Sequence, residues 1–397
     1  MDGLEEFGAA LEGVRVVGLG ESTHGTAEFF RLKHRLFAHL VTEHGFRTLA
    51  MEASASAGLA VDAYVRDGAG DAATALTGLG FWTWRTREVL DLLEWMRSYN
   101  RGRPRADRIG FTGIDPQRSG ASVAHFGPER AGVLSVLADA QPGRLPERRA
   151  ELLAAAAELE AETSDTVDRW HARVLARAAD VATVESRERL GRIRDGHMAD
   201  GVDEAVTASG GAGVAVWAHN GHVGVRGAAL GARLRERYGP AYYALGLFFG
   251  EGAFRARRMW PGPWGPRPDR PSRVAVNRIG PAGPDTLEAL LAAAPAEPGV
   301  SPEAVAPAEP GVSPEAVAPP EPGASREAVA PSEPAGARLL DLRSRAHEEW
   351  TRRTYPARTH GAYVARFVYR RNVVPVVPGE EYDGLAYVPV STPSRPL

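Results

Sequence analysis

The chain has 397 residues, of which 44% are hydrophobic and 24% are charged, as in globular proteins with a substantial core. A net charge of −3 gives no basis for nucleic acid or an anionic membrane as a partner, and no apolar run reaches the roughly 20 residues of a membrane span. Cysteine is absent, which excludes disulfides and cysteine nucleophiles. The acidic N-terminus lacks an apolar h-region, so we expect a cytoplasmic protein that acts on a small molecule. Nothing in the sequence indicates an oligomeric state.

Four apolar runs each end in a glycine, an acid or a histidine, as buried parallel strands do at a functional sheet edge. These runs cover residues 14–19, 47–51, 109–114 and 214–218. Helical periodicity over residues 27–44 and 87–99 separates them. The alternation predicts an α/β fold in which a parallel or mixed central sheet is flanked by helices.

The second half of the chain is less regular. Residues 128–206 are rich in Ala, Glu, Arg and Leu and predict an inserted helical subdomain, either a cleft wall or lid or a plain structural bundle. The α/β core would then comprise residues 1–127, 207–295 and 335–397. Residues 296–334 carry a twelve-residue Pro/Gly-rich repeat, which predicts a disordered or polyproline-like surface loop. Further strands are expected at 241–249, 373–377 and 385–388, and a helix at 286–293.

Acids and histidines follow the four predicted strands: Glu21, His24, Glu52, Asp115, His219 and His222. Because the carboxyl ends of parallel strands share one sheet edge, we expect these side chains to meet there. A histidine beside a carboxylate supplies a base of near-neutral pKa and the partner that orients it. Hydrolysis needs both, together with donors that stabilise the developing oxyanion. The sequence therefore predicts a hydrolytic site.

Each of these residues also has a structural interpretation. Glu52 suits a helix N-terminus, and Asp115 before Pro116 is typical of a turn. Ser22 beside His24 is a weaker alternative nucleophile, because no G-x-S-x-G elbow is present. The prediction is that no cofactor is bound. The alternative is a divalent metal on the hard nitrogen and oxygen ligands Glu21, His24, His219 and His222.

Several segments resemble the erythromycin esterase family, which includes succinoglycan biosynthesis homologues. They are GESTHGTAEFF (20–30), GFRTLAMEAS (45–54), WTWRTREVLDLLEWMRSYN (82–100), FTGIDPQ (111–117), RDGHMAD (194–200), VWAHNGHV (216–223) and YDGLAYV (382–388). They occur in family order and cover nearly the whole chain except the repeat. The resemblance implies an α/β core with a helical region beside a deep cleft. It also implies a carboxylic ester hydrolase that opens macrolide lactones with histidine-activated water and no obligatory metal.

The resemblance also implies roles for individual residues. His24 corresponds to the general base, with Glu21 and Glu52 as its acidic neighbours. His219 and His222 correspond to paired histidines that position water or polarise the carbonyl.

One position departs from the family. Lys33 stands where the family usually carries an arginine, which keeps the charge and loses the bidentate fork. We expect Lys33 to contact the oxyanion, with Arg31 or Arg35 as substitutes. The expected substrate contacts are Trp82, Trp84, Arg85, Asp115 and Arg31, although core packing explains the two tryptophans equally well.

The sequence therefore predicts an erythromycin-esterase-like hydrolase of an ester or macrolactone. A natural-product tailoring enzyme that runs a dehydration, cyclisation or acyl transfer in the same His/Glu pocket is the first alternative. A metal-binding or ligand-binding protein without turnover is the second. The sequence leaves the substrate open.

Overall fold

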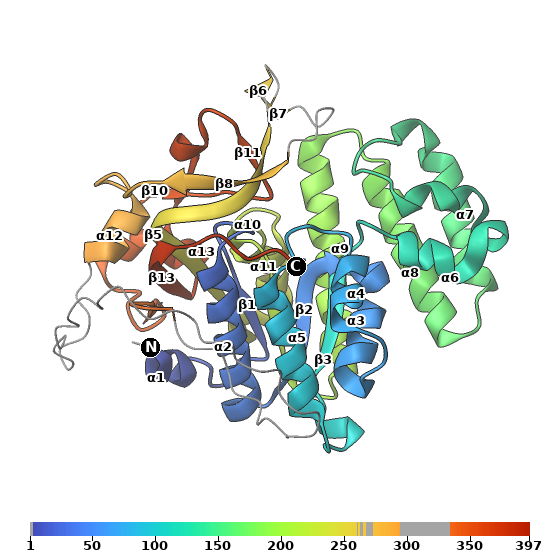
Figure 1. Cartoon of the computed structure of the whole chain (residues 1–397), viewed down its shortest axis with the longest axis horizontal. Coiled ribbons are helices and arrows are strands. Elements are labelled where there is room, and N and C mark those ends of the chain that lie inside the picture. Colours follow the sequence, from blue (N-terminus) through green and yellow to red (C-terminus); the bar gives the residue numbers. More distant parts are fainter. Residues whose placement is uncertain (1–2, 260, 263–264, 267–272, 294–333) are drawn as a thin grey trace, which may run out of the picture.

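The computed structural model describes residues 3–259, 261–262, 265–266, 273–293 and 334–397 (Figure 1). Their main element is a nine-stranded sheet with the order β3-β2-β4-β1-β5-β13-β9, in which β11 and β8 also pair with β5. The strand bounds are β1 Val16–Leu19, β2 Phe46–Ser54, β3 Gly110–Asp115, β4 Gly213–Trp217, β5 Tyr242–Met259, β8 Val274–Ile279, β9 Arg338–Asp341, β11 Tyr363–Ala365 and β13 Gly384–Ser391. All neighbouring pairs run parallel except β8 with β5 and β9 with β13. The predicted mixed α/β sheet is confirmed.

Helices cover both faces of the sheet (Figure 1). One face packs against α1 Leu4–Ala9, α2 Ala27–Glu43, α3 Ala55–Asp67, α4 Ala72–Gly78 and α5 Arg87–Asn100. The other face packs against α9 Arg187–Ala208, α10 Asn220–Val223, α11 Leu230–Tyr238 and α12 Leu287–Ala293. The apolar stripe of α2 explains its place, because it buries Phe29, Phe30 and Phe37 completely. The hydroxyl of Thr86 caps α5 by accepting a hydrogen bond from the Val89 N–H.

The predicted helical insertion forms a separate layer with its own core. It contains α6 Gly120–Ala131, α7 Arg149–Glu162 and α8 Thr166–Ala182, packed around Leu134, Leu152 and Leu175. Two features differ from the expected boundaries of 128–206. The helical layer begins with α6, eight residues earlier, and α9 lies on the sheet with Met198 in the sheet's core.

The segments after α11 differ most from the prediction. Strand β5 has 18 residues, and its second half, which pairs with β8 and β11, continues well beyond the expected end at residue 249. The strand expected at 373–377 is β12 Val373–Val376, which pairs with β10 Tyr355–Arg358 outside the main sheet. β6 Pro261–Gly262 pairs antiparallel with β7 Gly265–Pro266, and α13 Pro378–Glu381 precedes β13. The repeat of residues 296–331 lies outside the described residues. None of the described helices is long and apolar enough to cross a membrane.

The last residues of the chain hold the start of two helices at the carboxyl edge of the sheet. The Thr392 N–H and hydroxyl donate to the Glu28 carboxylate at the start of α2. The Arg395 N–H and guanidinium donate to Glu88 at the start of α5. These bonds fix the first turn of α2, which follows directly on the loop that carries His24.

Candidate active site

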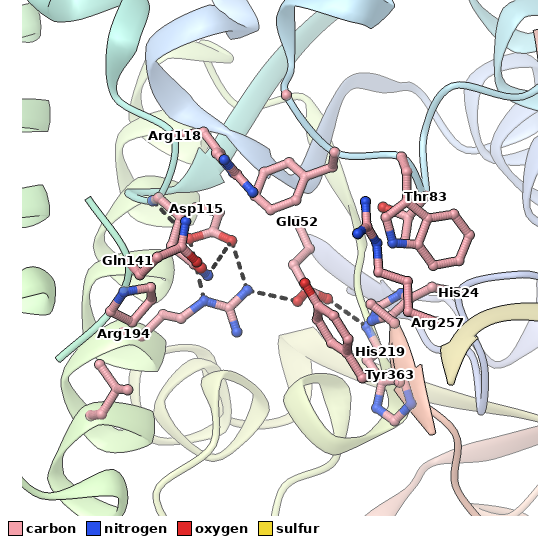
Figure 2. A pocket seen from close by; sticks show the side chains of 18 of the residues that line it. His24, Glu52, Thr83, Asp115, Arg118, Gln141, Arg194, His219, Arg257 and Tyr363 are labelled. Carbon is pink, nitrogen blue, oxygen red and sulfur yellow. Dashed lines mark hydrogen bonds and ion pairs between the residues drawn. The ribbon is translucent and has the colours of Figure 1, made fainter. Parts of the chain in front are cut away.

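The carboxyl ends of β1 to β4 open into a cavity of about 1140 Å³ (Figure 2). Seven of the residues singled out in the sequence line this cavity: His24, Glu52, Trp82, Trp84, Asp115, His219 and His222. Glu21 and Lys33 lie beneath its floor and are fully buried. Arg31 and Arg85 are absent from its lining; Arg31 lies near Glu28 and Glu88 instead. The structure thus brings the strand-end groups together and separates them from these two arginines.

His24 is held by a buried carboxylate. Its Nδ1 lies 2.6 Å from Glu21 Oε1, and the ring packs edge-on against Trp84 at 5.6 Å. Because Glu21 also pairs with Lys33, it is an ionised acceptor, and the His24 proton belongs on Nδ1. The Nε2 lone pair is then on the opposite side of the ring. A neutral histidine in this tautomer is suited to accept a proton from water.

Lys33 supports this pair from below. Its Nζ donates to Glu21 Oε2 at 2.8 Å and to the Ala218 carbonyl at 3.3 Å, and it lies 4.6 Å from the centre of the Trp217 ring. Burial lowers the pKa of Lys33 to about 8, although the Glu21 charge opposes this shift. The ammonium is enclosed by protein, so its place differs from the expected contact with an oxyanion in the cleft.

Two glycines let the loop after β1 pass close to its neighbours. A Cβ on Gly20 would come within 2.1 Å of Asn220 Oδ1, and one on Gly25 within 1.9 Å of the Arg255 carbonyl. Both positions therefore require glycine. The close approach places His24 next to the start of α10, where its ring lies 5.1 Å from that of His219.

Glu52, at the end of β2, links three elements of the site. Its Oε2 accepts the backbone N–H of His219 at 2.9 Å, and its Oε1 accepts Arg194 Nη2 at 2.7 Å (Figure 2). The Trp84 indole donates to the Glu52 carbonyl at 3.0 Å. Burial alone would raise the pKa of Glu52, but the cationic His222 and Arg194 outweigh it and hold the pKa well below its usual range. Glu52 is therefore a fixed anion.

Arg194 on α9 bridges two strand ends. Beyond Glu52 it contacts Asp115 twice, Nη2 to Oδ2 at 2.7 Å and Nε to Oδ1 at 3.2 Å. Asp115 also accepts the backbone and side-chain N–H groups of Gln117 at 3.0 Å each. Burial lowers the pKa of Arg194, but the charges of Asp115 and Glu52 outweigh this effect and raise the pKa. Asp115 is thus a fixed partner of Arg194.

His222 lies between two carboxylates. Its Nδ1 is 2.8 Å from Asp195 Oδ1 and its Nε2 is 3.3 Å from Glu52 Oε1. Burial lowers the pKa of His222, but Glu52 and Asp195 outweigh this and raise it to about 10. Arg194 Nη1 also lies 3.1 Å from Nε2, and because two donors cannot bond each other, the charged ring directs this N–H at Glu52 alone. Asp195 accepts the Leu230 N–H as well, which ties the site to α11.

The pKa of His219 is shifted in the opposite direction to that of His222. Burial lowers the pKa of His219 well below its usual range, so the ring is neutral. Its Nδ1 accepts the Gly221 N–H at 3.2 Å, which assigns the proton to Nε2. Nε2 is buried and has no hydrogen-bond partner among the described residues. The ring therefore carries an unused N–H donor beside His24.

The cavity walls come from three other regions. The loop before α5 contributes Phe81 to Trp84, and the helical layer contributes residues 141–144 and 184–185 together with Leu190 of α9. The outer half of β5 and the segment leading into β11 contribute Arg257, Met259 and Tyr363. Of the tryptophans, Trp84 is almost fully buried against Phe30 and Trp217, so it packs in the core and borders the cavity at the same time.

The alternative metal ligands are otherwise engaged. Both Glu21 oxygens are bound, by His24 and Lys33. Within the described part of the chain, no group of three or more His, Asp or Glu side chains is arranged to hold a metal ion.

Three residues of the site were not singled out from the sequence. Arg194 and Asp195 stand in the quoted segment RDGHMAD, whose helical surroundings suggested an insertion and gave no sign of proximity to the strand ends. Arg257 belongs to the second half of β5, beyond the predicted end of that strand. For Arg194 and Asp195 the available signal was an adjacent acid and base inside a family segment.

A parallel-sheet core with a histidine–carboxylate pair and a neutral histidine at its carboxyl edge defines an enzyme-like site in a large cavity. The Erythromycin esterase family profile matches residues 41–391, and the chain belongs to this family. Membership supports a hydrolase-like function.

Individual relatives agree with this assignment. An Erythromycin esterase type II of Escherichia coli is 32% identical over 108 residues, which are 27% of this chain and 25% of that protein. The match thus spans about a quarter of the curated relative. Among solved structures, a succinoglycan biosynthesis protein superposes with a TM-score of 0.75 at 20% identity, over 99% of this chain and 92% of the other.

Two further structures show the same fold. A protein from Bacillus cereus gives a TM-score of 0.72 at 19% identity, over 99% of this chain and 93% of the other. A mutant of the erythromycin esterase EreC in its open conformation gives 0.65 at 17% identity, over 98% and 94%.

Proposed function

We propose that this protein is an esterase that opens an ester or macrolactone with a water molecule activated by His24. The observation that carries the proposal is the His24 ring, anchored through Nδ1 to Glu21 and lining a cavity next to the unused N–H donor of His219. The pair supplies the base and the carbonyl donor that ester hydrolysis requires.

The reaction follows from these positions. His24 Nε2 takes a proton from water as the water oxygen adds to the substrate carbonyl carbon. The His219 Nε2–H donates to the oxyanion of the tetrahedral intermediate, and the charged His222 ring adds favourable potential. The intermediate collapses as the ester C–O bond breaks, and His24 returns its proton to the leaving alkoxide. An acid and an alcohol result, and the enzyme is regenerated.

The surrounding charges serve this step by holding the rings in place. Glu21 stabilises the imidazolium of His24 as it forms, and Lys33 keeps Glu21 ionised and oriented. Glu52 fixes His219 through its backbone N–H. Arg194 holds Glu52 from the helix side. In this scheme Lys33 is a positioning residue, because it reaches neither water nor substrate.

The test is mass spectrometry of products after incubation with a panel of macrolides and simpler esters, in ordinary and ¹⁸O-enriched water. We expect a gain of one water whose oxygen comes from solvent, and a rate about 10²- to 10⁴-fold lower in His24→Ala. His347→Ala, which removes an exposed histidine, is the matched control and should retain the rate. Full activity in His24→Ala refutes the mechanism.

The same experiment separates the alternatives. Loss of water, or no net mass change in a converted substrate, identifies a tailoring reaction in the same pocket. Elemental analysis of chelator-treated and untreated protein addresses the binding-protein alternative. A stoichiometric metal that disappears in His219→Ala would support that alternative and contradict the proposed use of His219 as a free donor.

A further inference from the structure

The cavity carries more positive charge than the proposed chemistry uses. Its lining contains four arginines, Arg118, Arg144, Arg194 and Arg257, and three carboxylates, Glu52, Asp115 and Glu185. Arg194 is paired with Glu52 and Asp115, and His222 also faces Glu52. The remaining three arginines therefore face the cavity with one acid, Glu185, which is exposed in the segment between α8 and α9.

Arg257 comes from the wall that the outer half of β5 forms. Along β5, alternate residues share a face, so Arg257 points the same way as Met259, which also lines the cavity. Its backbone N–H bonds to the Ala362 carbonyl, which fixes the strand beside Gly361 and Tyr363. Its Nε is buried without a hydrogen-bond partner among the described residues, and no described carboxylate forms an ion pair with it.

Such a group is costly to leave unpaired. A buried guanidinium N–H without a partner loses the hydration that it has in the unfolded chain, and proteins usually supply an acceptor. Nε itself is enclosed by protein, and the described residues accept no hydrogen bond from the rest of the guanidinium, which borders the cavity. A bound oxyanion would complete it, since a carboxylate or phosphate matches the arginine fork.

Arg118 extends from a second wall, on the other side of Glu52 in Figure 2. It is half-buried, its guanidinium lies 5.8 Å from the Phe81 ring, and no described acid pairs with it. Its backbone has φ 61°, a left-handed conformation that side-chain-bearing residues rarely adopt. The Ser54 hydroxyl donates to the Arg118 carbonyl at 2.8 Å and holds this conformation. The chain thus fixes a second unpaired cation at the cavity.

We propose that the substrate is an ester that carries a second, anionic group, a carboxylate or a phosphate, which binds Arg257 with Arg118 contributing from the facing wall. The inference rests on the proposed function, because it assigns the substrate class of the same cavity. It also implies that a cationic ester is disfavoured, because two of the three acids in the lining, Glu52 and Asp115, are already paired with Arg194 or His222.

The test uses four aryl acetates whose phenoxide leaving groups differ only at a para-CH₂X substituent, and each rate is compared with the rate of hydrolysis of the same ester without enzyme. X is carboxylate, phosphonate, carboxamide or trimethylammonium, so acyl group and spacer are constant. We expect kcat/KM of at least one anionic ester to exceed that of the carboxamide by about tenfold or more, with the cation slowest. The better of the two anions identifies the group that the site accepts. Equal values for all four esters, or a preference for the cation, overturn the proposal.

Variants assign the effect to the arginine. Arg257→Gln should remove the anion preference by lowering kcat/KM of the anionic esters much more than that of the carboxamide, and Arg257→Lys should restore part of the preference. Arg101→Gln, which removes an exposed arginine just after α5, is the charge-matched control and should change nothing. An equal loss on all four esters in Arg257→Gln would show a structural role and refute the assignment.

A second readout separates this proposal from the hydrolase proposal. If no ester is hydrolysed in a His24-dependent manner, the proposed function fails. Calorimetric titration with the corresponding inert methyl ethers then measures binding alone. Tighter binding of an anionic ether than of the carboxamide, lost in Arg257→Gln, supports the anion site without turnover. The absence of any Arg257-dependent difference overturns it.

Discussion

Arg194 offers the sharpest test of how this site is held together. It makes contacts of 2.7 Å to Glu52 and of 2.7 and 3.2 Å to Asp115, and both acids are almost completely buried. In Arg194→Met the side-chain volume is nearly kept and the charge is lost. The two carboxylates then remain in the interior without their principal counter-charge.

The magnitude follows from burial. Breaking a buried ion pair by removing one partner costs about 3–5 kcal/mol, mostly through the uncompensated charge that stays behind. Here Glu52 keeps the His219 N–H and His222, and Asp115 keeps two bonds from Gln117. We therefore expect Arg194→Met to lose about 3 kcal/mol in the free energy of unfolding, the lower end of this range.

The assay is equilibrium urea unfolding at neutral pH, with a double-mutant cycle. Asp115→Asn in the Arg194→Met background removes one stranded charge, so the double variant should be more stable than additivity allows, by about 1–3 kcal/mol. Arg192→Met is the matched control on the same helix. Its ion pair with Glu188 is exposed, so we expect a change within about 0.5 kcal/mol. Equal effects of the two methionine variants, or strict additivity in the cycle, would refute the reasoning.

Two further predictions concern the histidine rings and their supports. The raised pKa of His222, about 10 in the folded protein against 6.5 as a free side chain, means that its contribution to stability is fully present below about pH 6.5 and is lost as the pH rises to about 10. His222→Gln should therefore flatten the decline in unfolding free energy measured by urea titrations between pH 6.5 and 10, and an unchanged slope would contradict the assignment. Lys33→Met should lower kcat about tenfold with little change in KM, because it removes one charge-assisted bond to Glu21 outside the substrate cavity. Steady-state kinetics on any accepted ester would measure this, and a selective rise in KM would instead favour the direct substrate contact expected from the sequence.

The fold and the strand-end groups were readable from sequence because both rest on local patterns. Apolar runs that end in Glu21, Glu52, Asp115 and His219 mark buried parallel strands, and such strands align their carboxyl ends whatever their order in the sheet. The order of the strands in the sheet depends on which face each connecting helix covers. Local sequence patterns do not specify that face.

The missed residues act across long separations in sequence. Arg194 bonds to Asp115 over 79 residues and to Glu52 over 142. Helical periodicity around Arg194 predicts a helix and does not say that α9 crosses the strand ends. For Lys33 the periodicity gives the face of α2 but not the depth of burial, so the sequence predicts a contact in the cleft where the structure has a buried lysine that supports Glu21. The expected end of β5 at residue 249 missed Arg257, because charged residues interrupt the apolar run while the strand continues.

The distribution of residues in the cavity separates chemistry from recognition. His24, Glu52 and His219 stand on the ends of core strands, where packing on both sheet faces fixes their backbone. The walls that meet the rest of the substrate come from the helical layer, the loop before α5 and the outer half of β5. These segments lie away from the carboxyl ends of β1 to β4 and can differ among proteins that keep the same strand ends. Family membership therefore constrains the reaction more tightly than the substrate. In this chain, the unpaired arginines of the cavity walls are the residues from which we infer the charge of the substrate.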